Sequence, residues 1–285
     1  MPSPDNQDNW TMIIRPRRGW FELNLGELWR ARELVILFFW RDFVAIYKQT
    51  ILGPLWFLIQ PILTTVTFTI VFGLIAKLPT DGVPGFLFYM SGTVLWAYFA
   101  ESLNKTSTTF ISNENLFGKA YFPRLAVPLS ILLSNLVTFV IQFSLFMIFL
   151  LYFYLSGSGI RPNLWMLFLP VLLLLMAGMG LGFGIIVSAL TTRYRDLRFL
   201  VTFGVQLLMY ATPVIYPLSS VPDAFKPFLL ANPLAAVIET FRFAFLGVGT
   251  LNPWALLYSA VFTAVLLLIG ILLFNHVEST FMDTV

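Results

Sequence analysis

The side chains that could act as acids, bases, nucleophiles or ligands are few and scattered in this chain. Its 285 residues include 17 Lys and Arg, 14 Asp and Glu, one His and no Cys. The lack of Cys excludes disulfides, thiol catalysis and thiolate metal sites. His276 stands alone near the C-terminus, and we expect it to be an ordinary surface residue. A membrane-bound glycosyl or acyl transferase would need acidic or His residues gathered at the membrane surface, so this sparse set argues against an enzyme.

The sequence contains no motif for binding a nucleotide and no charged residue placed to couple transport to an ion gradient. The Gly-x-x-x-x-Gly-Lys loop that cradles nucleotide phosphates is absent, because Asn113 stands where the first glycine would precede Gly118-Lys119. No charged residue lies near the middle of a long apolar run, where coupling to a proton or sodium gradient would require one. We expect neither a cofactor nor a metal in this chain. If the chain is a transporter, it would draw its energy from another subunit, or it would work as an ATPase-independent channel or secondary carrier.

The elements that carry these residues are membrane helices. The composition is 58% hydrophobic and 11% charged, whereas a soluble domain is about a quarter charged. Six charge-free runs are each long enough to cross the hydrocarbon, which takes about 20 residues. Runs this continuous exclude the alternation of a membrane barrel. We therefore expect an all-α polytopic membrane protein, built as a single domain, with transmembrane helices at 51–76, 84–104, 126–155, 164–190, 198–216 and 253–274.

The Lys and Arg residues predict the orientation. With the N-terminus inside the cell, thirteen of the 17 fall in inner segments and four in outer ones, a strong positive-inside bias. Both termini are then cytoplasmic. No apolar core precedes Trp20, so no cleavable signal peptide is visible. The basic residues thus belong to membrane topology, and we expect no nucleic-acid partner.

The segment 25–48 mixes charged residues with Trp and Phe, which is typical of a helix that lies in the headgroup plane. Gly53 and Pro54 sit where this element must give way to the first span. The residues from Arg41 to Pro61, RDFVAIYKQTILGPLWFLIQP, resemble the entry segment of ABC-2-type permeases that export bacterial polysaccharides such as O-antigen. The pattern is carried by Arg41, Asp42, Tyr47, Lys48, Thr50, Leu52, Gly53, Trp56 and Pro61. The family commonly has Arg-Tyr-Lys where this chain has Ile46-Tyr47-Lys48, so one basic contact is missing.

The resemblance gives roles to the inner loops. The loop after the second span, 112–124, is expected to form a short helix that Ser112 caps and that runs through Lys119. In the family such a coupling helix sits in a groove of the ATPase subunit; a basic anchor at the inner surface is the plainer reading. The second inner loop contains Arg195 and Asp196, which match a family Arg-Asp, although a topological anchor explains its arginines equally well. The residues expected to couple to the ATPase are Asn113, Glu114, Leu116, Phe117, Lys119, Phe122, Arg124, Arg195 and Asp196.

The outer segment 222–246 is too apolar for a solvated loop and is broken by prolines, so we expect two short helices that dip into the membrane. Glu239 and Arg242, at i and i+3, can form an ion pair. The order of residues resembles the re-entrant extracellular gate of the same permeases. A surface cap with a self-satisfied ion pair is the alternative. The gate residues by resemblance are Tyr216, Asn232, Pro233, Glu239 and Arg242.

Polar and aromatic residues form stripes on two spans. The expected channel-lining residues are Gln60, Thr64, Phe68, Gln206 and Tyr210. Rings stack on sugar faces while hydroxyls and amides exchange hydrogen bonds, so these stripes suit a tunnel for sugars. Hydrogen bonds between helices, worth about 0.6 kcal/mol each, would explain them equally well. Five small residues from Gly178 to Ser188 predict close helix packing.

The resemblance implies a transport subunit of the bacterial cytoplasmic (inner) membrane. Two copies of the chain would line a channel as a homodimer, and two copies of a separate ABC ATPase would bind Mg-ATP. The transported molecule would be a lipid-linked glycan of the O-antigen, capsule or teichoic-acid type. The function would therefore be ATP-driven export of a polysaccharide.

Overall fold

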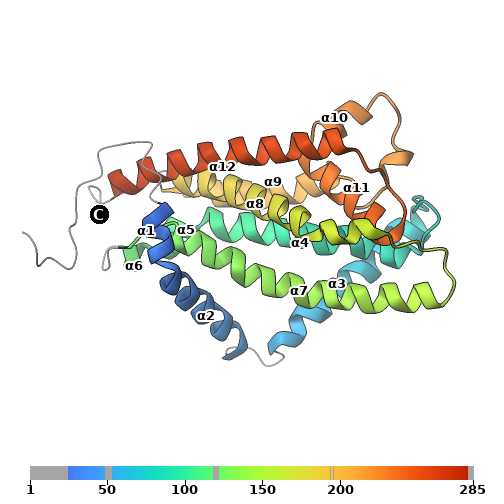
Figure 1. Cartoon of the computed structure of the whole chain (residues 1–285), viewed down its shortest axis with the longest axis horizontal. Coiled ribbons are helices and arrows are strands. Elements are labelled where there is room, and N and C mark those ends of the chain that lie inside the picture. Colours follow the sequence, from blue (N-terminus) through green and yellow to red (C-terminus); the bar gives the residue numbers. More distant parts are fainter. Residues whose placement is uncertain (1–24, 49–52, 118–121, 193, 195, 282–285) are drawn as a thin grey trace, which may run out of the picture.

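The computed structural model describes residues 25–48, 53–117, 122–192, 194 and 196–281. This part of the chain is helical and contains no β-strand. Its long helices lie side by side along the long axis of the molecule (Figure 1). The helices α1, α2, α5 and α6 gather at the end that holds the last turns of α12, and α10 and α11 lie at the opposite end. The segments expected inside and outside the cell thus lie at opposite ends of the bundle, while the sidedness itself stays a prediction.

The helices follow the expected order, and their bounds are as follows. The N-terminal half contains α1 (Leu25–Arg30), α2 (Arg32–Lys48), the 3-10 turn η1 (Gly53–Leu55), α3 (Trp56–Phe68), the π-helical η2 (Thr69–Ile75), α4 (Gly85–Ser107), α5 (Thr109–Ser112), α6 (Glu114–Phe117) and α7 (Ala126–Leu155). The C-terminal half contains η3 (Leu164–Phe168), α8 (Leu169–Thr191), α9 (Leu197–Tyr210), η4 (Leu218–Ser220), α10 (Lys226–Leu230), α11 (Pro233–Leu246) and α12 (Pro253–Phe281).

The change from α2 to α3 occurs at Gly53 and Pro54, as the sequence predicts. Gly53 has a φ of +46°, a left-handed conformation that a residue with a Cβ adopts at a cost. Pro54 follows in the 3-10 turn, where its fixed φ suits the first turn of a helix. The chain therefore leaves α2 and enters α3 in a new direction (Figure 1).

Within the described residues, four helical segments are long and apolar enough to cross a membrane: Trp56–Ile75, Ala126–Leu155, Leu164–Thr191 and Pro253–His276. Helices also occupy the other two expected ranges, but they do not meet this standard. The 23-residue α4 carries Glu101, Lys105 and several Ser and Thr residues. At 14 residues, α9 is about 21 Å long, less than the roughly 30 Å hydrocarbon thickness.

Polar residues are tolerated in α4 because it is the central helix of the bundle. It contacts α3, α7, α8, α9 and α11, and most of its side chains from Leu87 to Ser107 are buried. A helix enclosed by other helices has little lipid-facing surface, so its composition need not be uniformly apolar. This explains why α4 does not meet the hydropathy standard for a membrane span, although it occupies one of the expected ranges.

The expected close packing of α8 is confirmed. A Cβ on Gly178 or Gly182 would lie 2.5 Å and 2.8 Å from side-chain atoms of Thr263 and Leu266 on α12. A Cβ on Gly184 would lie 2.6 Å from Thr106 Cβ on α4. Alternate glycines thus let α8 approach both neighbours, one on each side.

The expected span 198–216 ends earlier than predicted. The helix α9 stops at Tyr210, and residues 211–216 form turns. Pro213 contributes to this break, because the residue before a proline is disfavoured in the helical conformation. The non-helical residues that follow α9 leave backbone carbonyls without helical partners, and these carbonyls become part of the site described next.

Candidate functional site

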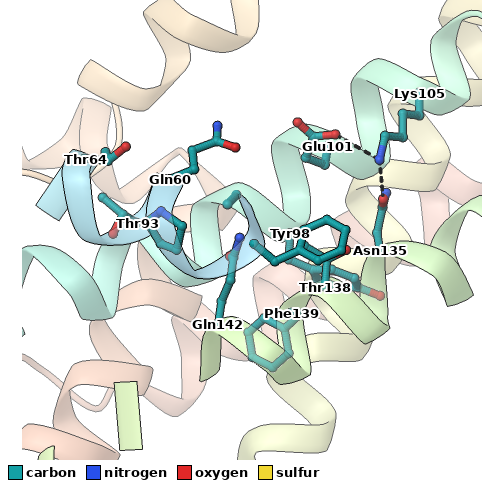
Figure 2. A pocket seen from close by; sticks show the side chains of 13 residues that line it. Gln60, Thr64, Thr93, Tyr98, Glu101, Lys105, Asn135, Thr138, Phe139 and Gln142 are labelled. Carbon is teal, nitrogen blue, oxygen red and sulfur yellow. Dashed lines mark hydrogen bonds and ion pairs between the residues drawn. The ribbon is translucent and has the colours of Figure 1, made fainter. Parts of the chain in front are cut away.

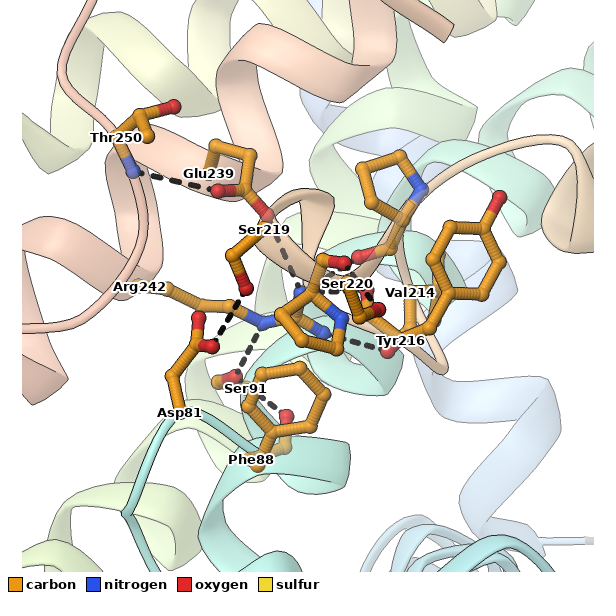
Figure 3. Close-up of polar contacts among 12 residues, drawn as sticks. Asp81, Phe88, Ser91, Val214, Tyr216, Ser219, Ser220, Glu239, Arg242 and Thr250 are labelled. Atoms are coloured by element: carbon orange, nitrogen blue, oxygen red, sulfur yellow. Dashed lines mark hydrogen bonds and ion pairs between the residues drawn. The ribbon is translucent and has the colours of Figure 1, made fainter. Parts of the chain in front are cut away.

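Arg242 on α11 is the centre of a buried polar cluster (Figure 3). Its side chain is 0% exposed. The guanidinium donates to the carbonyl oxygens of Pro213 at 2.6 Å and of Val214 at 2.5 Å. It also donates to the Tyr216 carbonyl at 3.4 Å. Arg242 therefore satisfies backbone carbonyls that the end of α9 has left in the protein interior, where an unpaired carbonyl is costly.

The same guanidinium reaches α4. Its Nε donates to Ser91 Oγ at 3.4 Å, and its carbon lies 3.8 Å from the centre of the Phe88 ring. Gly92 makes this approach possible, because a Cβ there would stand 2.7 Å from the Val214 carbonyl oxygen. Arg242 thus joins α11, α4 and the segment after α9 at one point.

Glu239 supplies the balancing charge. Its Oε1 lies 3.5 Å from Arg242 Nη1, and Glu239 is 2% exposed. The other carboxylate oxygen, Oε2, accepts a hydrogen bond from the Thr250 backbone amide at 3.2 Å. The predicted i, i+3 ion pair is present, and both of its members are buried. Arg242, which the sequence places in an outer segment, is an interior residue of α11.

The other expected gate residues lie near this cluster. Asn232 caps α11 by accepting from the Leu234 amide, and its own amide donates to Thr212 Oγ1 at 2.8 Å. Pro233 opens the helix and is buried. The expected helices in 222–246 are α10 and α11; α11 is packed against α12, α4 and α8. The depth of both helices in a membrane stays a prediction.

A polar cavity lies between α3, α4 and α7, and we call it the three-helix cavity (Figure 2). Its volume is about 230 Å³. It is lined by Phe57, Gln60, Pro61, Thr64, Thr93, Ala97, Tyr98, Glu101, Lys105, Asn135, Thr138, Phe139 and Gln142. Lys105 Nζ pairs with Glu101 at 3.2 Å and donates to Asn135 Oδ1 at 3.0 Å.

The structure divides the five expected channel-lining residues. Gln60 and Thr64 line the three-helix cavity. Phe68 packs edge-on against Phe72 and Tyr89 instead. Gln206 and Tyr210 are exposed on α9, away from that cavity. The cavity residues of α4 and α7 were not assigned this role from the sequence, although their spacing along each helix shows a shared face.

At the other end of the bundle, α2 shares a hydrophobic cluster with the loop after α4. This inner cluster consists of Val35, Phe38, Phe110, Phe117, Ala126, Val127, Ile185 and Phe274. The ring of Phe38 lies 5.4 Å from that of Phe122, which lies 5.7 Å from Phe117. The helix α2, which we call the interface helix, therefore packs through aromatic rings against Phe117 and Phe122, which belong to the loop 112–124.

The residues expected to couple to an ATPase differ in their exposure. Phe117 and Arg124 are buried, with Arg124 lying over the Phe117 ring at 5.4 Å. Leu116 and Phe122 are half-buried against the inner cluster. Asn113 is half-buried, Glu114 begins α6, and Asp196 precedes α9. Lys119 and Arg195 lie outside the described residues. The cap proposed for Ser112 is wrong, because this residue ends α5.

The helix α2, expected to lie in the headgroup plane, packs one face against the bundle and exposes apolar side chains on the other, while its place in a membrane stays a prediction. On α2, Val35 and Phe38 face the inner cluster, whereas Ile36, Leu37 and Trp40 are exposed. Arg41 pairs with Asp42 at 2.8 Å and lies over the Phe38 ring. Tyr47 and Lys48 end the helix, and their side chains are not described.

Within the described ranges, no three His, Asp or Glu residues gather as metal ligands would. Outside the four long apolar helices, a hydrogen bond from Lys226 lowers the pKa of Asp223. This exposed pair has the geometry of a surface ion pair, at 2.7 Å. The described residues form polar surfaces and packed contacts between helices.

Comparison with known proteins gives matches along most of the chain. Residues 33–246 match the family described as ABC-2 type transporter. The chain is 29% identical over 263 residues to the O-antigen export system permease protein RfbA of Klebsiella pneumoniae, covering 91% of this chain and 96% of the relative. RfbA of Myxococcus xanthus is 28% identical, covering 77% of this chain and 82% of the relative. The polysialic acid transport protein KpsM of Escherichia coli is 24% identical, covering 82% and 89%.

Proposed function

We propose, from the premise that the chain belongs to the ABC-2 type transporter family, that it is the permease subunit of an ATP-driven polysaccharide exporter. The transported molecule is a lipid-linked glycan, and the site of action is the bacterial cytoplasmic membrane. Both termini lie in the cytoplasm. The six helices α3, α4, α7, α8, α9 and α12 cross the membrane, with α10 and α11 as a re-entrant outer gate.

The observation that carries this proposal is the extent of the match to an O-antigen export permease. It covers nine-tenths of this chain and nearly all of the relative. A second relative is named for polysialic acid transport. The two names share a class of cargo, a cell-surface polysaccharide, and differ in its identity.

The working unit is a homodimer of this chain with two copies of a separate ABC ATPase, which binds Mg-ATP. Two helices support the dimer. The outer faces of α3 and α9 are exposed and apolar, and in α9 they include Phe199, Phe203 and Leu207. Gln206 and Tyr210 lie on the same exposed helix. Pairing two such faces would cover apolar surface and place polar residues along a central path.

Force passes from the ATPases to the bundle through the loop 112–124 and through α2. The inner cluster supports this step, because Phe38 and Phe122 pack against one another. A push on the loop would therefore move the interface helix with it. The motion would then open the path past the Arg242 cluster at the outer end.

Co-purification with the ATPase tests the proposal. The tagged chain is isolated from native membranes, and its bound proteins are identified by mass spectrometry, while cell-surface polysaccharide is measured in a strain that lacks the chain. We expect a stoichiometric P-loop ATPase and the loss of surface polysaccharide. Export that persists without the ATPase would overturn the proposal in favour of a channel or secondary carrier.

A charge reversal locates the contact with the ATPase. The variant Lys119→Glu should reduce ATPase recovery, because it changes the sign of the charge in the coupling loop. The matched control is Arg161→Glu, an exposed residue in the segment between α7 and η3, at the opposite end of α7. Equal loss of the ATPase in both variants would place the contact elsewhere.

A further inference from the structure

The three-helix cavity contains a polar side chain that the protein leaves without a partner. Gln142 is 8% exposed, and its amide makes no hydrogen bond to any described residue. Figure 2 shows it directed from α7 into the space between the three helices. Gln60, on the opposite wall, has no side-chain hydrogen bond within the described ranges either. Gln142 turns a primary amide with four hydrogen-bonding positions toward the cavity, whereas Gln60 is an exposed residue, so the cavity favours a polar occupant.

An acyl chain from the bilayer is a poor occupant. It offers no hydrogen-bond donor or acceptor, so the Gln142 amide would stay unpaired in an apolar medium, which is costly. Water or a polar ligand satisfies the amide instead. The cavity is therefore a polar binding space among helices that lie in the membrane.

The charges at the cavity favour a neutral ligand. Glu101 and Lys105 pair with each other, and Lys105 also donates to Asn135. Asn135 in turn donates to Ser102 Oγ at 3.3 Å. A phosphate or an ammonium would meet both members of this pair, whose charges cancel, so neither ion gains a net attraction there.

The cavity has room for one small unit of a ligand. Its 230 Å³ equals the share of about eight water molecules in the liquid. Pockets for drug-sized ligands are larger, at about 300–1,000 Å³. One six-membered ring with its hydroxyl groups fits this volume.

We infer that the three-helix cavity binds a single sugar ring, with Gln60 and Gln142 as the amides that hold its hydroxyl groups. Thr64 and Thr138 add hydroxyls on the same two walls. Tyr98 and Phe139 add aromatic surface, on which the C–H face of a sugar packs. This inference rests on the proposed function and deepens it. The site is distinct from the exposed α9 surface that carries Gln206 and Tyr210.

Single-cysteine labelling tests the site, because the chain has no Cys of its own. Ala97→Cys, at a cavity-lining position of α4 that leaves both amides in place, is compared with Ser144→Cys, an exposed position on α7 whose hydroxyl bonds to its own helix. Membranes containing the chain with its ATPase are treated with a small charged thiosulfonate, with and without mannose, galactose or N-acetylglucosamine. We expect one of these sugars to slow labelling at position 97 about tenfold at ten times its Kd, because only the empty cavity reacts.

Labelling at position 97 that is unchanged by all three sugars at about 100 mM, well above a millimolar Kd, would overturn the inference, as would equal slowing at position 144. Gln142→Leu should also reduce surface polysaccharide several-fold at an unchanged membrane level, whereas Ser144→Leu should not. Full export by Gln142→Leu would likewise overturn it. The proposed function fails separately, if a strain without the chain keeps its surface polysaccharide.

Discussion

Gly92 on α4 lies directly against the Arg242 guanidinium on α11. A Cβ at position 92 would stand 2.9 Å from Arg242 Nη2 and 2.7 Å from the Val214 carbonyl oxygen. These atoms form one of the shortest hydrogen bonds of the cluster, at 2.5 Å. Because Gly92 has no side chain, the buried Arg242 guanidinium can reach the Val214 carbonyl oxygen after α9.

Gly92→Ala should lower the stability of the chain. The added methyl group has no space between a backbone carbonyl and a guanidinium, and overpacking of this kind costs about 1–3 kcal/mol. The midpoint of thermal unfolding of the purified chain in detergent measures the effect. Gly204→Ala on α9 is the control, because a Cβ there meets nothing within 4 Å. Alanine is also the better helix former. Equal midpoints for the two variants would contradict the packing described here.

Replacing Arg242 or Glu239 should be strongly destabilising. Glu239→Gln leaves the buried guanidinium without its countercharge, and breaking a buried ion pair costs about 3–5 kcal/mol. Arg242→Lys keeps the charge but loses the planar fork that reaches two carbonyls at once. Both variants should accumulate in the membrane at lower levels and unfold at lower temperature. Lys226→Met removes one member of the exposed pair with Asp223 and should have little effect. Wild-type stability in Arg242→Lys would show that charge alone, without the fork, is sufficient.

The sequence predicts the local features of the fold well. The Gly53–Pro54 junction and the Glu239–Arg242 spacing depend on neighbouring residues, and both are found. The helix ranges are found too, except that α9 ends at Tyr210 and not at 216. The glycines of α8 also show their packing role by spacing alone. These features follow from periodicity and backbone preference, which act over a few residues.

The partners of Arg242 could not be predicted in this way. Ser91 lies 151 positions before it in the chain, and Val214 lies 28 before it. Carbonyl oxygens carry no signal in the sequence, so only the folded arrangement shows them. The three-helix cavity presents the same difficulty, because Gln60 and Gln142 belong to stripes on different helices. The sequence places Gln60 in a polar stripe, but it does not predict the cavity that Gln60 shares with Gln142.

Gly184→Ala should separate α8 from α4. A Cβ there would lie 2.6 Å from Thr106 Cβ and 3.2 Å from the Leu103 carbonyl oxygen. Alanine normally stabilises a helix by about 1 kcal/mol relative to glycine. A net loss of stability would therefore show that the steric clash with Thr106 outweighs this gain. Gly73→Ala is the control, since its nearest neighbour stands at an ordinary 3.5 Å. Thermal unfolding of both purified variants gives the comparison, and a gain in stability at position 184 would refute the close approach.

Phe38 and Phe122 should be energetically coupled. Their ring centres lie 5.4 Å apart and join α2 to the loop 112–124. Aromatic pairs contribute about 0.5–1.5 kcal/mol beyond their buried area, so Phe38→Leu and Phe122→Leu should be less than additive when combined. A double-mutant cycle on unfolding midpoints measures this term, and Leu37→Ala, at an exposed position of α2, serves in place of Phe38→Leu as the uncoupled control. If the pair also transmits force, the single variants should export less polysaccharide while still binding the ATPase. Strict additivity, with unchanged export, would mean that α2 and the loop move independently.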